Sequence, residues 1–497
     1  MILGIPVYVL LAPGGGFLTE NRIPIFFAAV AMSIIGGVIA SRSDLLKRLC
    51  FLGFMATLVF PIFDINFFVD RAFVGVPSAR GLYITAADLF ALSLAVAVLL
   101  GGGHPKIRAK FPGAFPYLAY IAIAALSMVN MLSYAPVGFV NPAYAYGVFE
   151  LFNIVKGLVV FWVMVNFMRG EKEIRLVLIV LMSAILIEAA VAAYHQYALH
   201  IYRRSAGTLG HSNSLAMFIG MILPVVLLLM LTSRKGKVIP WALAVLFVVG
   251  IALMLKTVAR GGMVAMVISC SLAGALLVLK VRRLHAARIA LLIILVGAGG
   301  AGLIYKFWGV IMTRFGAESG EAAASTRSRI TLLQAGVDIW LESPVIGNGI
   351  NSFPIEITLN PRGGIGVAEQ HNLYLLTLCE TGVLGLLAFF AIIFRVFQIA
   401  RRLIQQNINP GLRVLSIGLA CGMLHVLIES FFEFMFRAVF ISYIFWMFAA
   451  MIVSSWYMFK DQVTQIQMAR LAFARRMTAA GDAVPRRVPQ YGSSLKQ

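Results

Sequence analysis

Residues 213–232 read NSLAMFIGMILPVVLLLMLT, which is a run of 20 positions without a charged side chain. A bilayer core about 30 Å thick is spanned by roughly 20 apolar residues in an α-helix. Similar runs recur along the chain, at 23–41, 49–63, 82–101, 114–133, 148–167, 176–198, 239–256, 261–280, 288–306, 371–395, 413–432 and 437–458, with a shorter one at 2–12. The sequence therefore predicts an all-α polytopic membrane protein with about 12–14 transmembrane helices.

The composition excludes a soluble globular protein. Of the 497 residues, 61% are hydrophobic and only 12% are charged, whereas soluble domains carry about 25% charged residues. The spans are continuous and not alternating, which excludes a β-barrel. The net charge of +21 does not indicate nucleic acid, because the basic residues fall in every second loop, as the positive-inside rule requires of cytoplasmic loops.

This alternation divides the chain into four parts and places one large loop on the outer side. The other loops expected to face the periplasm or exterior are short, namely 64–81, 134–147, 199–212, 257–260 and 433–436. The four parts are transmembrane helices at 1–306, a large periplasmic loop at 307–370, the last three transmembrane helices at 371–458, and a basic cytoplasmic tail at 459–497. We expect the first half of the tail to lie on the inner leaflet, held by its arginines.

The large loop is the expected location of the chemistry, because loops of this length are usually functional. It contains an amphipathic pattern near 326–341, and turn signals follow in SPVIGNGINSFP and NPRGG. The apolar positions at helical spacing are Ile330, Leu333, Val337, Trp340 and Leu341.

Arginines on the outer side need an explanation other than orientation. Arg204 precedes a span, Arg260 lies in a very tight hairpin, and Arg329 lies in the amphipathic segment of the large loop. A guanidinium group matches phosphate oxygens in a bidentate manner. These residues therefore indicate an anionic lipid headgroup such as a diphosphate. The alternative is that each arginine pairs with an acidic residue of the same loop or extends to the interface.

His371 is the strongest single candidate for catalysis. It stands where the large loop re-enters the membrane, in EQHNLYLLTLCETGVLGLL (369–387). A neutral imidazole can accept a proton from a hydroxyl group, and Glu369, Gln370 or Asn372 would orient the ring. The alternative is a histidine with a structural hydrogen bond, as we interpret His195, His200, His211 and His425.

Several carboxylates lie in or near apolar runs, namely Asp88, Glu150, Glu188 and Glu429. Such groups mark proton paths or internal pairs. We expect pairing, with Lys156 or an arginine as partner for one of the first three and His425 for Glu429. The four cysteines are interpreted as packing residues.

The order of these motifs resembles one family. His371 and Asn372, followed after nine residues by Gly382 and after two more by Gly385, are similar to the signature of the O-antigen ligase and polysaccharide polymerase (Wzy-type) superfamily of bacterial membrane glycosyltransferases. The segments RSAGTLGHSNSLA (204–216), TVARGGMVA (257–265) and STRSRITLLQAGVDIWLESPVIGNGINSF (325–353) resemble its other motifs in the same order. The resemblance covers about 200–395 and departs from the family at His211-Ser212-Asn213, where many relatives have Asn-Pro-Asn.

The resemblance implies an inverting glycosyltransferase that needs neither a metal nor another cofactor. The donor would be an undecaprenyl-diphosphate-linked glycan, with His371 as general base, Arg204 and Arg260 on the diphosphate, Arg329 as a third diphosphate ligand, and Asn372, Gly382 and Gly385 in supporting roles. It also implies the bacterial inner membrane, with the active site facing the periplasm.

The identity of the acceptor leaves three functions open. A polymerase would extend a second lipid-linked repeat unit, and a ligase would transfer the glycan to a lipid A core. We favour the polymerase, because the extra spans and the tail would suit contact with polysaccharide export or chain-length proteins. A lipid-linked glycan transporter or flippase would explain the spans and arginines, but not the large loop or the His371 signature. Membrane lipids, and no nucleic acid, complete the expected partners.

Overall fold

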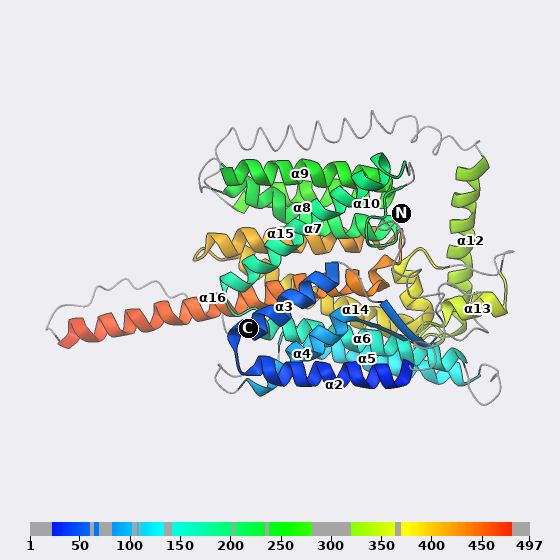
Figure 1. Ribbon diagram of the computed structural model, residues 1–497, viewed down its shortest axis with the longest axis horizontal. Helices are drawn as coiled ribbons and strands as arrows, with labels where there is room; N and C mark the ends of the chain where they lie inside the picture. The colour runs from blue at the N-terminus through cyan, green and yellow to red at the C-terminus, as the bar shows by residue number, and fades with distance from the viewer. Residues whose placement is uncertain are drawn as a thin grey trace.

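The computed structural model describes residues 22–59, 64–68, 82–101, 107–108, 111–133, 142–200, 204–233, 238–280, 320–362 and 369–479. Ten helices in these ranges are long and apolar enough to cross a membrane, and they run side by side in one bundle (Figure 1). This confirms the predicted all-α polytopic fold. The predicted runs at 2–12 and 288–306 lie outside the described residues.

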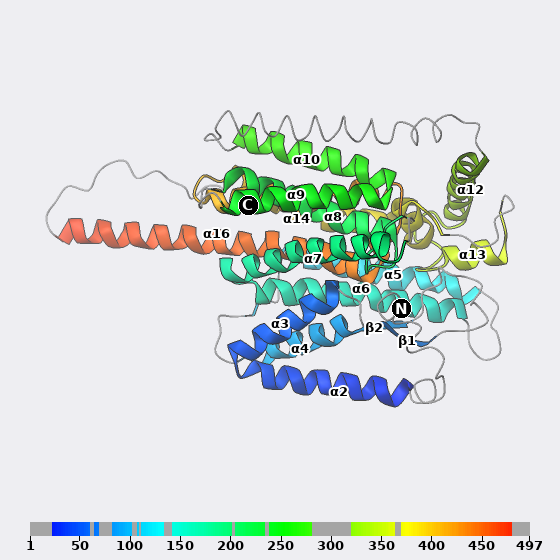
Figure 2. The same ribbon diagram turned by 45° about the horizontal axis from the view of Figure 1, so that its top comes forward.

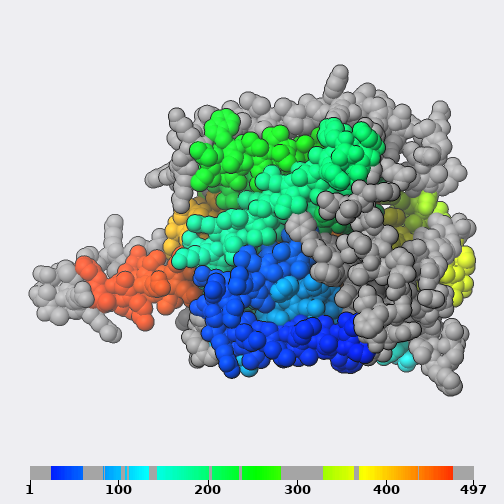
Figure 3. Space-filling model, viewed as in Figure 1, coloured from blue at the N-terminus to red at the C-terminus, as the bar shows by residue number. Residues whose placement is uncertain are grey.

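The spanning helices follow the predicted runs closely. They are α2 (Arg22–Ser41), α5 (Ala114–Ser127, continued by the 3-10 helix η2, Met128–Ser133), α6 (Pro142–Phe167), α7 (Glu171–Tyr197), α8 (Ser212–Thr232), α9 (Val238–Thr257), α10 (Arg260–Lys280), α14 (Leu373–Gln405), α15 (Pro410–Glu429) and α16 (Val439–Ala479). Figure 3 shows α2–α4, in blue, α7, in blue-green, and α9, in green, on one face of the bundle.

One predicted span is shorter than expected. Helix α4 (Ala86–Leu100) has 15 residues and begins four residues after the start of the predicted run 82–101. Helix α3 (Asp44–Val59) has 16 residues and begins and ends earlier than the predicted run 49–63. The outer strands β1 (Asp64–Phe68) and β2 (Leu82–Thr85) pair in antiparallel fashion with a register shift. Thr85 ends β2 and caps α4, because its backbone N–H donates to Asp88 at 2.8 Å while its hydroxyl accepts from the Asp88 N–H at 3.2 Å. The prediction of a helix from residue 82 is therefore wrong for the residues before this cap.

Helix α8 forms the centre of the bundle, because nearly all of its residues are buried. It packs against α9, α10 and α15. A Cβ atom at Gly422 would lie 2.2 Å from the Met221 carbonyl oxygen, so that only glycine allows α8 and α15 to approach this closely. Close backbone approach at small residues is how membrane helices gain packing energy.

Helix α14 bends at Gly382, whose φ of 65° lies in the left-handed region that favours glycine. The kink frees backbone groups that the turn after α12 satisfies. The N–H of Asn348 donates to the Cys379 carbonyl at 2.8 Å, and that of Val383 donates to the Pro344 carbonyl at 2.9 Å. A Cβ atom on Gly382 would lie 2.2 Å from the Val345 carbonyl oxygen. Gly382 therefore allows the turn after α12 to pack closely on the kink of α14.

The helix predicted near 326–341 is present as α12 (Gly320–Glu342). It lies across the ends of the spans, next to α13 (Phe353–Leu359), in both views (Figures 1 and 2). Its buried side chains are Leu332, Ala335 and Ile339, and they pack on α14. The predicted apolar stripe is instead mostly exposed, because four of its five residues (Ile330, Leu333, Val337 and Leu341) are between 41% and 60% accessible.

The start of the tail is part of the last helix. Residues 459–479 continue α16 as one helix that projects beyond the bundle, coloured red in Figure 1. Its expected place on the inner leaflet stays a prediction. Helix propagation is favourable once a preceding turn exists, which explains why the tail extends the span. Residues 480–497 lie outside the described part of the chain.

Candidate active site

His371 lies immediately before α14, at the end of the bundle where α12 lies. The next residue, Asn372, caps α14, because its side-chain oxygen accepts from the N–H groups of Tyr374 at 2.9 Å and Leu375 at 3.0 Å. Gln370 donates to the Leu332 carbonyl of α12 at 2.9 Å. Both residues were expected to orient the His371 ring. Asn372 instead caps α14, and Gln370 instead binds α12.

The residue that contacts the His371 ring is Glu433, which sequence reasoning missed. It is 5% exposed and lies in the short segment between α15 and α16. Its carboxylate is 3.2 Å from His371 Nδ1 and accepts from Arg329 Nη2 at 3.0 Å. The available signal was an acidic residue in an outer loop predicted to have only four residues.

Glu433 is a charged group in a buried position. Burial alone would raise the pKa of its carboxyl group, but hydrogen bonds from His371 and Asn213, together with the charges of His371 and Arg329, outweigh that effect and lower the pKa. The carboxylate favours the His371 tautomer in which Nδ1 carries the proton. The ring nitrogen Nε2 then keeps its lone pair, as a general base requires. The His371 side chain is 35% exposed, so a substrate can reach it.

Arg204 is connected to the same centre through Asn213. Its Nη2 donates to the Asn213 side-chain oxygen at 2.7 Å, and its Nε donates to the Thr257 carbonyl at 2.9 Å. Asn213 also hydrogen-bonds to Glu433. Arg204, Arg329 and His371, which are far apart in sequence, therefore meet around one carboxylate and one amide.

The departure from the Asn-Pro-Asn pattern has a visible structural role. His211 is the N-cap of α8, and its Nδ1 accepts from the Asn213 N–H at 3.2 Å. Burial lowers the pKa of His211, and the charges of Arg204 and His371 act in the same direction against that of Glu433. A neutral ring at this position can accept the capping hydrogen bond.

Arg260 is exposed at the first position of α10. It follows the predicted tight hairpin, in which Thr257 binds Arg204. The two glycines after Arg260 bring this end of α10 against its neighbours. A Cβ atom at Gly261 would lie 3.1 Å from the Cβ of Phe432, the residue before Glu433, and one at Gly262 would lie 2.9 Å from Ala216 of α8. The backbone of this segment thus positions Arg260 at the margin of the same centre.

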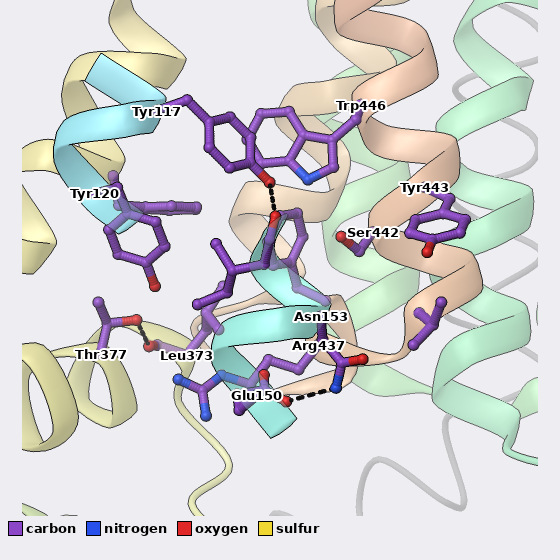
Figure 4. A pocket seen from close by; sticks show the side chains of 14 residues that line it. Tyr117, Tyr120, Glu150, Asn153, Leu373, Thr377, Arg437, Ser442, Tyr443 and Trp446 are labelled. Atoms are coloured by element: carbon purple, nitrogen blue, oxygen red, sulfur yellow. Dashed lines mark hydrogen bonds between the residues drawn. The ribbon is translucent and has the colours of Figure 1, made fainter. Parts of the chain in front are cut away.

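A second set of buried ionisable residues supports the segment that carries Glu433. Arg437, in the 3-10 helix η3 (Met435–Arg437), donates to Glu380 of α14 at 2.5 Å, and Glu380 is fully buried. Arg437 also lines a cavity of about 60 Å³, together with Glu150 and Asn153 (Figure 4). Because Arg437 lies only four residues after Glu433, the ion pair fixes the path of the chain at the active centre.

The expected internal pairs are largely present. Lys156 lies 2.9 Å from Asp88, and His425 Nε2 lies 3.1 Å from Glu429. Glu188 accepts from the backbone N–H of Thr208 at 2.9 Å, so its partner is a polar group and not a cation. The four cysteines form no disulfide, and three of them are buried.

Comparison with known proteins shows that some of these motifs lie inside a segment that matches a protein family and others lie outside it. Residues 246–390 match the family model described as O-Antigen ligase, and this segment contains Arg260, Arg329, His371, Gly382 and Gly385. Arg204 and Glu433 lie outside it and join the centre through contacts. No curated protein matches the chain. The match confirms the resemblance to the O-antigen ligase and Wzy-type polysaccharide polymerase superfamily, and it supports a multi-pass membrane glycosyltransferase of the ligase or polymerase type.

Proposed function

We propose that the protein is an inverting, metal-independent glycosyltransferase of the bacterial inner membrane. Its donor is an undecaprenyl-diphosphate-linked oligosaccharide, and it polymerises repeat units of an exopolysaccharide or O-antigen at the periplasmic face. The observation that carries this proposal is that His371 and Arg329 contact the same buried carboxylate, that of Glu433. A base and a phosphate ligand held this close suit attack on one side of a sugar and departure of diphosphate on the other.

The proposed reaction moves one proton and exchanges one bond. His371 Nε2 takes the proton of an acceptor hydroxyl while that oxygen attacks the anomeric carbon of the donor. The bond from this carbon to the diphosphate oxygen breaks on the opposite face, so the configuration inverts. Glu433 stabilises the imidazolium, and the charge that develops on the diphosphate is stabilised by arginines. Since Arg204, Arg260 and Arg329 are permanently charged, they can perform this role without a metal.

His371 and Arg329 contact different oxygens of the Glu433 carboxylate. Arg329 is 43% exposed on its side chain, whereas Glu433 is 6% exposed. Part of the guanidinium can therefore bind a phosphate oxygen while one nitrogen stays on Glu433. The proposed role of Arg329 as the third diphosphate ligand rests on this geometry.

The ligase is the second candidate, because the matching family model is described as O-Antigen ligase. The test uses the purified protein in lipid nanodiscs, lipid-linked single repeat units as the sole glycan, and separation of the products by size. His371→Ala serves as the blank. A ladder of growing chains that the variant does not make supports the polymerase. Transfer only after addition of lipid A core supports the ligase. Absence of both products, with movement of the donor across the membrane when the protein is placed in closed vesicles, contradicts both and leaves a transporter.

A further inference from the structure

The surface of α12 is divided into three faces, and one of them packs on other described parts of the protein. Leu332, Ala335 and Ile339 form the first face and pack on α14. The carbonyls of Leu332 and Gly336 accept from Gln370 at 2.9 Å and from Cys379 at 3.0 Å, so this face is firmly attached. Outside this face, Arg329 binds Glu433 and Glu342 pairs with Arg362.

The second face is apolar and exposed. At 3.6 residues per turn, Ile330, Leu333, Val337 and Leu341 fall within an arc of about 80°. Their accessible fractions are 51%, 41%, 41% and 60%. A continuous exposed apolar patch of this kind marks a contact surface for a protein or a membrane.

The third face is polar and lies between the apolar face and the packed face, on the side of the helix away from Arg329. It carries Gln334, Asp338 and Glu342, spaced four residues apart and all exposed. Glu342 pairs with Arg362 of the same loop. Polar and apolar side chains that occupy separate sectors of one exposed helix are typical of a helix at a boundary between water and lipid.

The direction of α12 agrees with such a boundary. It lies across the ends of the spanning helices and not parallel to them (Figures 1 and 2). The spans themselves expose large apolar side chains around the bundle, for example Leu118, Ile179, Val245 and Phe394. The exposed face of α12 therefore has the same apolar character as the exposed surface of the spans.

We propose that the exposed apolar face of α12 lies in the outer-leaflet interface of the membrane, so that lipid contact and α14 together hold this helix in place. Arg329 lies on the helix surface between the apolar face and the face that packs on α14. A lipid-linked diphosphate in the same leaflet would then approach Arg329 laterally, at headgroup depth. The lipid contact does not depend on the proposed function, whereas the approach of the diphosphate rests on it.

The test measures lipid contact directly and needs no activity. Val337→Cys and Leu333→Cys probe the apolar face, and Gln334→Cys and Asp338→Cys are matched controls on the polar face of the same helix turns. Each variant is labelled with bimane in nanodiscs made of ordinary phospholipid or of phospholipid brominated on its acyl chains. The parent protein, with its four native cysteines, gives the labelling background.

We expect bromine to reduce the fluorescence at 333 and 337 at least twofold more than at 334 and 338. Equal quenching on both faces, or no quenching at 333 and 337, would overturn the proposal and would favour a protein partner for this face. Two positions per face keep the test decisive if one variant fails to fold. A positive result together with an inactive glycosyltransferase assay would preserve the lipid contact and reject only the proposed function.

Discussion

Replacing Glu433 with glutamine removes one charge and leaves the shape of the side chain almost unchanged. The carboxylate is buried and contacts His371 at 3.2 Å and Arg329 at 3.0 Å. A hydrogen bond to a charged group contributes about 1.5–3 kcal/mol, and the contact with His371 gains strength only when the ring becomes an imidazolium. At about 1.4 kcal/mol per tenfold change, the turnover rate should fall about 10- to 150-fold.

The assay is transfer from the lipid-linked donor by purified Glu433→Gln in nanodiscs, with kcat and the donor KM measured separately. The matched control is Glu342→Gln, which also removes a carboxylate paired with an arginine of the large loop but lies on the exposed polar face of α12. We expect a lower kcat for the first variant and unchanged kinetics for the second. A kcat for Glu433→Gln within twofold of the parent value would refute the assignment of Glu433 as the residue that positions and charges His371.

Four further predictions concern the diphosphate ligands, the kink, the buried ion pair and pH. Arg260→Ala should raise the donor KM and lower kcat at least tenfold through loss of charge stabilisation, measured by donor titration. Gly382→Ala should lower the melting temperature, because φ is 65° and an added Cβ atom meets a carbonyl oxygen at 2.2 Å. Arg437→Met should destabilise the protein by about 3–5 kcal/mol, since it leaves Glu380 buried without its partner, measured by denaturant unfolding. Because the pKa of Glu433 is lowered on folding, its contribution to stability is complete above the unfolded pKa of about 4.3 and is lost as pH falls through the lower folded value. The difference in melting temperature between the parent and Glu433→Gln should therefore narrow below about pH 4.

Each of these predictions has a control or a contrary outcome. Arg175→Ala, an exposed arginine at the start of α7, should leave donor kinetics unchanged, and an equal loss there would mean a general charge effect. Normal melting of Gly382→Ala would show that the kink tolerates a side chain. Restoration of stability by Arg437→Met combined with Glu380→Leu is expected, and its failure would contradict the ion-pair explanation. A melting difference that widens in acid would reverse the sign assigned to Glu433.

The spans were predictable because hydropathy over 20 residues reports directly on the membrane. Ten predicted runs match spanning helices, and the tight Arg260 hairpin is present. The contact face of α12 was not predictable, because periodicity identifies an apolar stripe but does not distinguish burial on protein from contact with lipid. The beginning of α4 was misplaced because the Thr85 cap consists of two local hydrogen bonds, which cannot be predicted from apolar composition.

The candidate site was predictable only in part. His371 and Arg204 each carry a local signal, namely a titratable or cationic group on the outer side of the membrane. Glu433 carries a weaker signal, an acidic residue in a short outer loop, because its importance comes from a contact with a residue 62 positions earlier in the chain. Asn372 was assigned to the histidine ring on sequence proximity, whereas the unsatisfied N–H groups at the start of α14 engage its side-chain oxygen.

The most direct test of the central claim is a single-turnover experiment with excess His371→Ala in nanodiscs, lipid-linked donor and an acceptor glycan. Donor binding is followed by retention of labelled donor, and bond formation is followed by product size. We predict normal donor binding and no new glycosidic bond, with the parent protein forming product in the same mixture. Product formation by His371→Ala at the parent rate would contradict the assignment of His371 as the general base.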